Sequence, residues 1–397
     1  MELTNEQRLI RDTVREFVET DVLEGIDEHD ADQTFPEDVW DGLAELDLTG
    51  LTVPEEYGGF DADEVTYSIV NEELGRGHLA VATALSVHCL ATSCIRQFGT
   101  QEHKDEWLPE MVDGRPVGAF ALSEPDAGSN PAEMSTEARL EDGEYVINGK
   151  KQWITNGKRA GVVVLFAKTD RDDPDTVTQF LVPKDTPGLE VGKKEDKLGL
   201  RASDTTTLLF DDVRIPEENR LTEVGDGLKA AFSILTGGRI AIASQAVGVA
   251  QAALDAAVSY ANEREQFGEP IIEHQAIAHK LADMQTDVQA ARLLTRDAAR
   301  KNDDGLDPQA ASMAKYFASE TAVDVANEAV QVHGATATPR TSTSNATTVT
   351  PRSPRSTRGR RKYRRKSSHG TCRSSVTRTR KIRRPFSCRG RRPRPSV

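Results

Sequence analysis

Two short stretches hold the residues whose types and spacing best suit chemistry. The first, "SEPDAGS" from Ser123 to Ser129, is a polar loop where backbone amides and hydroxyls can approach a ring or a phosphate. The second, "QWIT" from Gln152 to Thr155, offers a flat tryptophan wall beside a threonine hydroxyl. Taken alone, such a loop is more often a surface turn, and a strand tryptophan is more often part of a core.

Other kinds of site find less support. His88, Cys89 and Cys94 could ligate a metal, but their apolar helical surroundings favour core positions, so we expect no metal site. The remaining cysteines are Cys372 and Cys388, and no two of the four form a CxxC pair or suggest an oxidised framework. No strand, GxGxxG turn and helix occur together, and there is no Walker loop. A nicotinamide or nucleoside triphosphate enzyme is therefore unsupported.

The pattern of the chain changes twice. Helical periodicity fills the first third, which begins with a capping box at Thr4 and Gln7. From Val117 to Leu221, β-branched runs and turn residues predict an antiparallel β domain. Asn148-Gly149 and Asn156-Gly157 are expected to be tight turns on either side of a short strand. Three long helical segments follow.

This order predicts an α+β multidomain fold. It consists of an N-terminal helical domain, a central antiparallel β domain, a C-terminal helical bundle and a disordered basic tail. The expected ranges are 1–116 for the helical domain, 117–222 for the β domain, 223–334 for an incomplete bundle and 335–397 for the tail.

Charge divides the chain at Gly334. The sequence holds 50 Lys and Arg against 64 Asp and Glu, a formal charge of -14. Residues 335–397 contain 20 of the basic residues and no acidic one, which leaves 30 against 64, or -34, up to Gly334. Such a body resists compaction in dilute buffer, so we expect a protein of concentrated salt in a halophilic cytoplasm. An acidic face that binds a partner is the alternative.

The N-terminus has no apolar core of the kind that a signal peptide carries, and no run approaches membrane-spanning length. We therefore expect a soluble cytoplasmic protein with no membrane partner.

Five stretches together resemble the acyl-CoA dehydrogenase family. In chain order they are "FALSEPDAGSN", "GKKQWITNG", "KLGLRASDTTTLLFDDVRIP", "GGRIAIASQAVGVAQAALDAAVSYANEREQFG" and "HQAIAHKLADMQ". Each is weak alone, but they follow the family's order and spacing, and the resemblance extends to Gly334. It implies the family's three-part fold, a bound FAD and α,β-desaturation of an acyl-CoA thioester. It also implies electron transfer to an electron-transfer flavoprotein, and a homotetramer.

The resemblance also implies where the cofactor lies. Leu122 and Ser123 would lie near the flavin ring, Ser129 toward phosphate, and Trp153 and Thr155 against the isoalloxazine. A second group would contact the pyrophosphate and adenosine side, usually that of a neighbouring subunit. The implied cofactor-binding residues are Phe120, Leu122, Ser123, Ser129, Trp153, Ile154, Thr155, Arg264, Gln266, Phe267, His274, Gln275, Gln331 and Gly334. Ser129 and Arg239 would contact the substrate.

The family's catalytic base has no counterpart in this sequence. In most members it is the Glu of a C-terminal I-Y-E-G-T segment, which is missing. Other members carry it immediately before the arginine of the "GGRIAIA" stretch, where Gly238 stands. Glu124 and Glu265 lie in flavin-side motifs and are expected to be solvated or structural. We leave the base unassigned and expect little or no desaturation.

A shifted reading frame would account for the missing segment. One plausible coding of I-Y-E-G-T-S-E-I-Q, read one base late, translates as the stretch Ser356 to Arg364. The same displacement turns the family's G-Y-G-Y-T into Ala335 to Pro339. The Glu codon then falls across Thr357 and Arg358. We predict that one nucleotide is missing after the codon for Gly334, and that FAD retention is weakened.

Two alternatives remain. The basic tail is also typical of a disordered nucleic-acid-binding arm, although molar salt would weaken such binding. The chain could also be a non-catalytic flavoprotein that binds FAD or acyl-CoA for structure or sensing.

Overall fold

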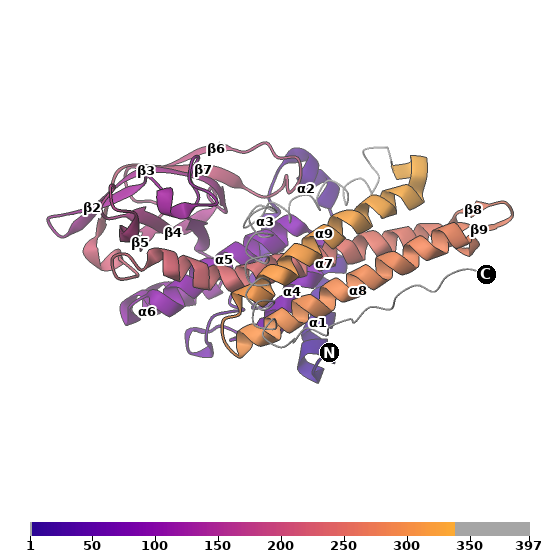
Figure 1. The fold of residues 1–397 in the computed structure, drawn as a ribbon. Helices are drawn as coiled ribbons and strands as arrows, with labels where there is room; N and C mark the ends of the chain where they lie inside the picture. The colour runs from indigo at the N-terminus through magenta and orange to yellow at the C-terminus, as the bar shows by residue number, and fades with distance from the viewer. Residues whose placement is uncertain (1, 338–397) are drawn as a thin grey trace, which may run out of the picture.

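The computed structural model describes residues 2–337, in which helices come first, a sheet follows and a helical bundle comes last (Figure 1). The predicted order of helical, β and helical parts is confirmed. The sheet lies at one end of an elongated molecule, and the long helices run from it to a small hairpin at the other end. The predicted tail, 335–397, falls almost entirely outside the described residues.

The N-terminal helices start at side-chain caps. Thr4 accepts a hydrogen bond from the amide of Gln7 at 3.1 Å and Gln7 returns one, so the predicted capping box is confirmed. Asp63 and Thr100 cap two later helices. The elements are α1 (Asn5–Phe17), η1 (Val18–Val22), α2 (Ile26–Asp32), α3 (Glu37–Glu45), η2 (Glu55–Tyr57), α4 (Glu64–Gly77), α5 (Leu79–Phe98) and α6 (Gln101–Val112).

Two helices, α5 and α7 (Gly227–Glu263), reach the length and hydropathy of membrane-spanning segments. The prediction that no run approaches that length is therefore wrong. Their most apolar windows are 89% and 78% buried inside the molecule, so the protein's own core covers them. An alanine-rich helix in a protein core can be as apolar as a membrane-spanning helix, so composition alone does not distinguish these two kinds of helix.

The central part is one mixed sheet. Its strands are β1 (Val117–Ala121), β2 (Glu137–Glu141), β3 (Glu144–Thr155), β4 (Ala160–Lys168), β5 (Val177–Pro183), β6 (Leu189–Lys194) and β7 (Thr205–Pro216), joined in part by η3 (Pro131–Glu133) and η4 (Pro174–Thr176) and followed by η5 (Glu217–Asn219). The order is β1-β4-β2-β3-β7-β6, with β5 on β4. Most pairs are antiparallel, as predicted, but β4 pairs in parallel with β1 and β2. Parallel pairing needs a long connection, which residues 122–159 supply between β1 and β4.

The two Asn-Gly dipeptides behave differently. Asn156-Gly157 forms the predicted turn after β3, with Asn156 at φ 63°. Asn148-Gly149 does not turn the chain, because β3 runs through it with a register shift beside β7. Asn148 and Asp212 exchange two hydrogen bonds of 2.9 Å across that bulge. Asn-Gly therefore forms a turn at one position and a β-bulge at the other, where β3 continues on both sides of the dipeptide and pairs with β7.

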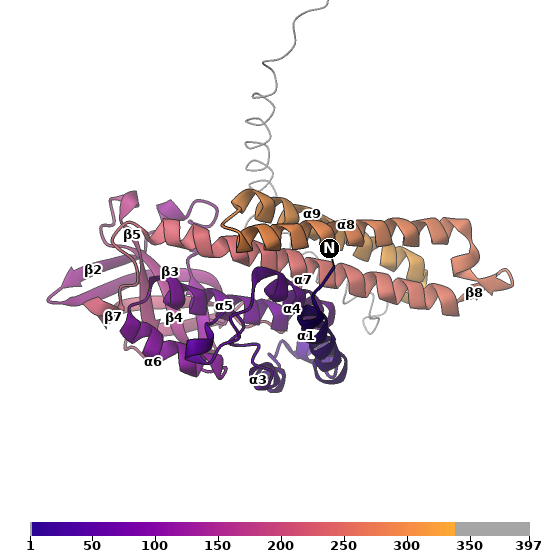
Figure 2. The same cartoon turned by 90° about the horizontal axis from the view of Figure 1, so that it is seen from below.

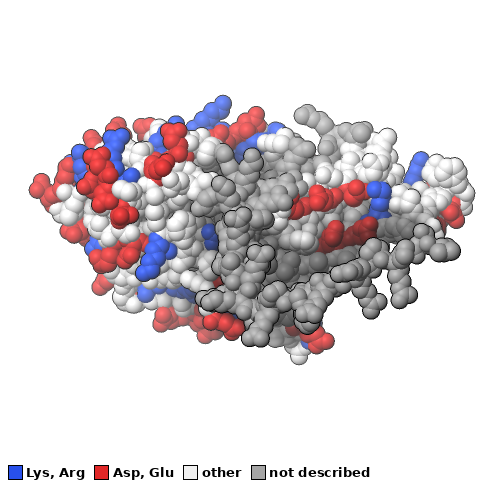
Figure 3. Space-filling model, in the orientation of Figure 1, with Lys and Arg blue, Asp and Glu red and all other residues white. Residues whose placement is uncertain are grey.

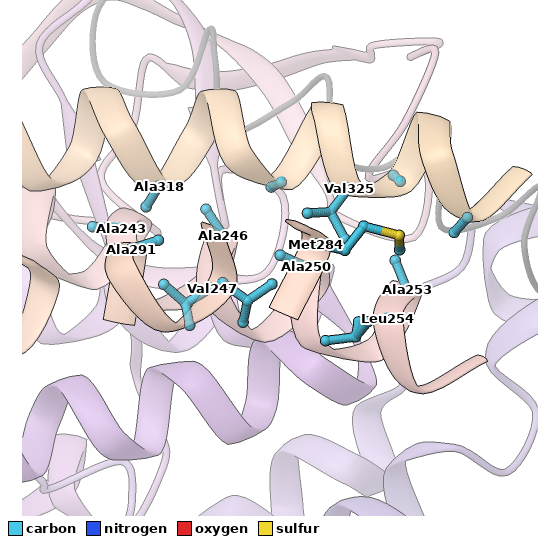
Figure 4. Packing of buried hydrophobic residues seen from close by; sticks show 14 of the residues in the cluster. Ala243, Ala246, Val247, Ala250, Ala253, Leu254, Met284, Ala291, Ala318 and Val325 are labelled. Atoms are coloured by element: carbon cyan, nitrogen blue, oxygen red, sulfur yellow. The ribbon is translucent and has the colours of Figure 1, made fainter. Parts of the chain in front are cut away.

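The C-terminal part is a bundle around α7. It continues with β8 (Glu265–Gln266), β9 (Glu269–Pro270), η6 (Ile271–Glu273), α8 (Gln275–Asp303), α9 (Pro308–His333) and η7 (Gly334–Ala337). Figure 2 shows α7 between the N-terminal helices on one side and α8 and α9 on the other. Small side chains let the helices approach closely, and Figure 4 shows Ala246 and Ala250 of α7 in the cluster with Ala291 of α8 and Ala318 of α9.

Helix α4 lies against α7 at glycines. A Cβ on Gly248 would stand 2.1 Å from the carbonyl oxygen of Glu72, and one on Gly75 would stand 2.7 Å from the Cα of Gln245. Where the helices touch, Ser68 and Ser244 lie 2.6 Å apart, oxygen to oxygen. The two backbones are therefore in direct contact, and only glycine fits at these points.

Candidate functional site

The loop after β1 and the end of β3 lie side by side. The amide of Gln152 donates to the carbonyl of Ser123 at 2.9 Å. Leu122 is 8% exposed and belongs to a core cluster that also contains Leu90 of α5 and Ile234 of α7. The two stretches that the sequence singled out therefore meet where the sheet joins the helices.

The loop itself is open on its outer side. Ser129 is exposed, and a Cβ on Gly128 would meet no atom within 4 Å. At the start of the loop, the ring of Phe120 packs 4.8 Å from that of Phe166 and is half-buried. Phe120 thus anchors the loop, while Gly128 and Ser129 leave its backbone accessible.

Trp153 is the exposed aromatic residue of this region. It lies at φ 59°, where the register of β3 against β7 shifts between Lys151 and Ile154. Trp153 is 51% exposed, whereas its neighbour Ile154 is 2% exposed. Trp153 is therefore not a core residue, and its indole offers a face on which another flat ring can stack.

The predicted site also offers three hydroxyls. Within residues 2–337, the hydroxyls of Ser123, Ser129 and Thr155 bond no other group of the protein. Ser123 and Thr155 are half-buried and Ser129 is exposed. A planar wall with free hydroxyls fits a polar aromatic ligand such as a flavin.

A buried ion pair ties the loop to the strand. Lys151 Nζ donates to Glu124 Oε1 at 2.7 Å and to the Leu122 carbonyl at 3.3 Å. Glu124 also accepts from the amides and hydroxyls of Ser135 and Thr136. Of the two expectations for Glu124, solvated or structural, the second is confirmed, because its side chain is 3% exposed and that of Lys151 is 0% exposed. Glu124 is a structural residue.

The environment sets the charge of this pair. Burial opposes ionisation of Glu124, but the charge and hydrogen bond of Lys151, with the donors from Ser135 and Thr136, lower the pKa of Glu124 to about 2. Burial lowers the pKa of Lys151 to about 8, against the opposing effect of Glu124. Both groups are therefore charged at neutral pH.

Two side chains join the strand end to α5. Asn156 Nδ2 donates to the carbonyls of Ala84 and Gly118 at 3.0 and 3.1 Å. His88 Nδ1 accepts from the amide of Gly118 at 3.0 Å, so Nε2 carries the proton and donates to the carbonyl of Met111 at 3.1 Å. Burial lowers the pKa of His88 to about 4. His88 is thus a neutral core residue, as expected, and not a metal ligand.

Sequence analysis missed Lys151 and Asn156 as residues of this site. The signal for Asn156 was present, since an Asn-Gly turn followed the Trp153 strand. No sequence signal pointed to Lys151, because a lysine on a strand is normally solvated.

The second predicted group lies elsewhere, around the hairpin of β8 and β9. Arg264, Gln266 and Phe267 are exposed there, and Phe267 is 97% exposed. The ring of His274 meets that of Phe267 edge-on at 5.8 Å, and its Nε2 lies 3.3 Å from the Gln266 carbonyl. Gln275 follows at the start of α8. These five residues form one patch, in which only His274 is half-buried.

The end of α9 lies beside this patch. His333 stacks on Tyr260 of α7 with 4.6 Å between ring centroids, and the Tyr260 carbonyl accepts from the amide of Arg264 at 2.9 Å. Gln331 is exposed on the last turn of α9, and Gly334 follows at φ 58°. Thr357 and Arg358, the predicted place of the family's Glu codon, lie outside the described residues.

The predicted cofactor-binding residues therefore fall into two groups. Those from Phe120 to Thr155 lie on the sheet, and those from Arg264 to Gly334 lie around the β8–β9 hairpin, at opposite ends of the molecule in both views (Figures 1 and 2). The structure brings each group together but does not bring the two groups to one place within a single chain.

Gly238 and Arg239 lie in the middle of α7, and both are buried. Arg239 Nη1 donates to the hydroxyl of Thr236 at 3.3 Å. Ser129, the other predicted substrate residue, lies in the loop after β1 and is exposed. Gly238 carries no functional group, so the alternative base position is empty.

One carboxylate approaches this part of α7. Glu64 Oε1 lies 3.1 Å from the place of a Cβ on Gly237. Burial, and then the charge of Asp303, raises the pKa of Glu64 to about 7. Glu64 lies on the α4 side of α7, and Gly238 is turned about 100° from Gly237 around the helix. Glu64 therefore does not occupy the alternative base position.

A cavity of about 290 Å³ lies apart from both groups. It is bounded by η1, α2, the junction of α4 and α5, Leu200 and α7. None of the predicted site residues lines it. Residues 2–337 contain no cluster of His, Cys, Asp or Glu that could hold a metal ion.

Family models match almost all of the described chain. The N-terminal domain of acyl-CoA dehydrogenases matches residues 4–115, the middle domain residues 119–213, and the C-terminal domain residues 225–363.

Curated relatives agree with these matches. An acyl-CoA dehydrogenase of Bacillus subtilis is 43% identical over 84% of this chain and 89% of its own length. The short-chain specific mitochondrial acyl-CoA dehydrogenase of Rattus norvegicus is 43% identical over 84% and 82%. Acryloyl-CoA reductase (NADH) of Anaerotignum propionicum is 40% identical over 84% and 85%.

Solved structures share the fold. Butyryl-CoA dehydrogenase from Megasphaera elsdenii is 36% identical, with a TM-score of 0.91 over 94% of this chain and 99% of its own. A glutaryl-CoA dehydrogenase from Mycobacterium smegmatis in complex with FADH2 is 32% identical, with a TM-score of 0.89 over 94% and 95%.

Proposed function

Because the chain belongs to the acyl-CoA dehydrogenase family, we propose that it derives from an FAD-dependent enzyme for α,β-desaturation of an acyl-CoA thioester. The observation that carries the proposal is the junction of Ser123 with Gln152, which sets an exposed indole and free hydroxyls beside the helices. Relatives named short-chain specific support a short acyl group, so butyryl-CoA is the first substrate to test.

The residues at this junction fit FAD. Trp153 supplies a face for the isoalloxazine, and the hydroxyls of Ser123 and Thr155 are free to bond its polar edge. FAD, when bound, supplies the acceptor for the hydride that leaves the β-carbon. The protein contributes orientation of the thioester and exclusion of water, for which the buried wall of Leu122 and α7 is suited.

We also propose that this chain is catalytically impaired. Removing the weakly acidic α-proton requires a positioned base. Gly238 has no side chain to act as one, and the other base position of the family lies outside the described residues. A non-catalytic protein that binds FAD or acyl-CoA is the alternative function that this observation favours.

Introducing a carboxylate at the alternative base position tests both the proposed desaturation chemistry and the proposed impairment. Gly238→Glu should desaturate butyryl-CoA, measured with a ferricenium acceptor, while the unmodified chain should not. Gly237→Glu is the matched control, because it adds the same carboxylate about 100° around α7 and beside Glu64. Activity in the unmodified chain would contradict the proposed impairment. Failure of either protein to bind FAD would contradict the proposed function.

The separation of the two groups of predicted cofactor-binding residues leads to a proposal about the oligomeric state. A single chain presents the flavin-facing residues at one end and the exposed patch of Phe267 and Arg264 at the other. Two copies packed head to tail could bring both to one FAD, so we propose a homo-oligomer, a tetramer as in the family. Sedimentation velocity of the purified chain measures this directly.

An electron-transfer flavoprotein is the proposed electron acceptor. One solved chain that matches with a TM-score of 0.91 comes from a study titled for the electron transferring flavoprotein of Acidaminococcus fermentans. Reduction of such a flavoprotein by the Gly238→Glu variant with butyryl-CoA would support the pairing.

The missing Glu segment leads to the reading-frame proposal. We propose that one nucleotide is absent after the codon for Gly334, so that 335–397 is an out-of-frame translation. Resequencing the 3′ end of the gene tests it, and an intact frame would refute it. If the frame is intact, DNA retardation that is lost on deleting 335–397 would favour the nucleic-acid-binding alternative.

A halophilic cytoplasm remains the proposed setting. Acidic side chains are spread over several parts of the face that Figure 3 shows. They support a body adapted to concentrated salt, where repulsion among carboxylates is screened.

A further inference from the structure

The ion pair of Glu124 and Lys151 connects three segments that border the flavin-facing surface. Glu124 belongs to the loop after β1, Lys151 to β3, and Ser135 and Thr136 to the segment before β2. The hydrogen bonds between Glu124 and Lys151, from Ser135 and Thr136 to Glu124, and from Lys151 to the Leu122 carbonyl are 2.5 to 3.3 Å long. The sulfur of Met134 lies 3.8 Å from Lys151 Nζ. No other charged side chain bonds either member of the pair within residues 2–337.

The positions of these bonds are specific. Lys151 Nζ reaches the carbonyl of Leu122, and the next amide along the strand, that of Gln152, reaches the carbonyl of Ser123. Two successive carbonyls of the loop are thus held by two successive residues of β3. Trp153, which comes next, is exposed, whereas Ile154 after it is buried and Thr155 is half-buried.

Stability alone is a weak reason for such a pair. Removing two charges from water costs free energy that their attraction repays only in part, and apolar replacements are often as stable. A buried pair is better explained where it fixes one geometry among several. Here the geometry that it fixes is the separation of the loop from the strand end.

We infer that Glu124 and Lys151 are positioning residues for the flavin, holding Leu122 and Ser123 against the Trp153–Thr155 strand end and thereby setting FAD affinity. This inference rests on the proposed function. Neither side chain touches the cofactor in this account, since both are buried behind the surface that would meet it.

The test compares two single variants, Glu124→Gln and Lys151→Met, with the double variant. FAD affinity is measured on the full-length apoprotein by quenching of FAD fluorescence, and stability by urea unfolding. Each single variant should lose stability, because it strands a buried charge or its donors. Each should also bind FAD roughly 10- to 100-fold more weakly, the loss of affinity seen when residues that orient metal ligands are replaced.

The double variant separates positioning from stability. It removes the stranded charge, so stability should recover while FAD affinity should stay low, because the bond to the Leu122 carbonyl is absent. Recovery of affinity together with stability would overturn the inference. So would unchanged affinity in folded single variants.

A control is the buried pair of Glu72 on α4 and Arg296 on α8, 2.8 Å apart with both side chains 9% exposed. Glu72→Gln should lose stability without weakening FAD binding of the folded protein. If it weakens binding as much as Glu124→Gln, the effect is global and the inference fails.

Amide hydrogen exchange needs no cofactor. Exchange at Ser135, Thr136 and Gln152 should accelerate in Glu124→Gln apoprotein and remain unchanged in Glu72→Gln. An unmodified chain that binds no FAD would overturn the proposed function, whereas unchanged exchange in Glu124→Gln would overturn the positioning role itself.

Discussion

The side-chain amide of Asn156 donates to the backbone carbonyl of Ala84 at 3.0 Å, which fixes the turn after β3 on helix α5. The same amide holds the carbonyl of Gly118 in β1 at 3.1 Å. One buried side chain thus ties the turn after β3 to both helix α5 and strand β1.

Replacing Asn156 should therefore destabilise the protein strongly. Asn156→Ala leaves two buried carbonyls without this donor and places alanine at φ 63°, a combined cost of about 2 to 4 kcal/mol by urea unfolding. Asn148→Ala is the matched control, since it also loses two hydrogen bonds but in a more exposed place. A larger loss in Asn148→Ala would contradict this assignment.

The contact of α4 with α7 predicts a second sensitive position. Gly248→Ala would place a Cβ 2.1 Å from the Glu72 carbonyl oxygen, so the helices must separate, at a cost of about 3 kcal/mol or more. Gly237→Ala should be tolerated, because its Cβ would meet only the end of the Glu64 side chain, at 3.1 Å. Thermal unfolding of both variants measures the difference.

Glu64 should make stability depend on pH. Its folded pKa is raised to about 7 from a usual 4.5, so the folded state keeps a proton that the unfolded state releases between these values. This contribution is fully present below about pH 4.5 and is lost as pH rises through 7. Glu64→Gln should match the unmodified protein at pH 4 and exceed it by about 3 kcal/mol at pH 8. Equal stabilities at pH 8 would disprove this.

Because Phe267 is exposed on the β8–β9 hairpin, we expect its replacement to affect assembly. If a second copy covers this aromatic, Phe267→Ser should shift the purified protein toward monomer in sedimentation without changing the unfolding of the monomer. Leu9→Ser, at an apolar residue of α1 that is 68% exposed, serves as the control and should leave assembly unchanged. A monomeric unmodified chain would refute the proposed oligomer.

Salt should stabilise the folded chain. Up to Gly334 it carries 30 basic against 64 acidic residues, and screening of their repulsion shortens its range from about 10 Å at 0.1 M to about 3 Å at 1 M. The unfolding temperature should rise with KCl through the molar range and should not rise with an equal osmolarity of sucrose. A flat response to KCl would argue instead for a localised acidic docking face.

Much of this molecule followed from the sequence because local patterns were strong. The capping box at Thr4, the helix–sheet–helix order and the turn at Asn156 depend on neighbouring residues and were predicted correctly. The parallel partners of β4 and the bulge at Asn148 depend on which strands pair, and a local pattern does not encode this.

In the candidate site, too, local motifs were predictable and contacts between distant segments were not. Motifs identified Ser123 and Trp153 as belonging together, and the structure brings their segments within hydrogen-bonding distance through Gln152. The burial of Lys151 and Glu124 was not predictable, because it results from the crossing of three segments distant in sequence. Exposure of Trp153 likewise follows from a bulge and not from its residue type.

Helix α7 extends from the sheet to the hairpin as one uninterrupted rod of 37 residues, which at the usual rise is about 55 Å long. Its length and its rotation are therefore coupled. Adding a single residue near the middle would push the hairpin outward by about 1.5 Å and turn it by about 100°, away from any neighbour that it had faced. Inserting a whole turn would restore the rotation but would still move the hairpin by about 5.4 Å along the axis, so the length of this helix is fixed if both ends are to serve one assembly.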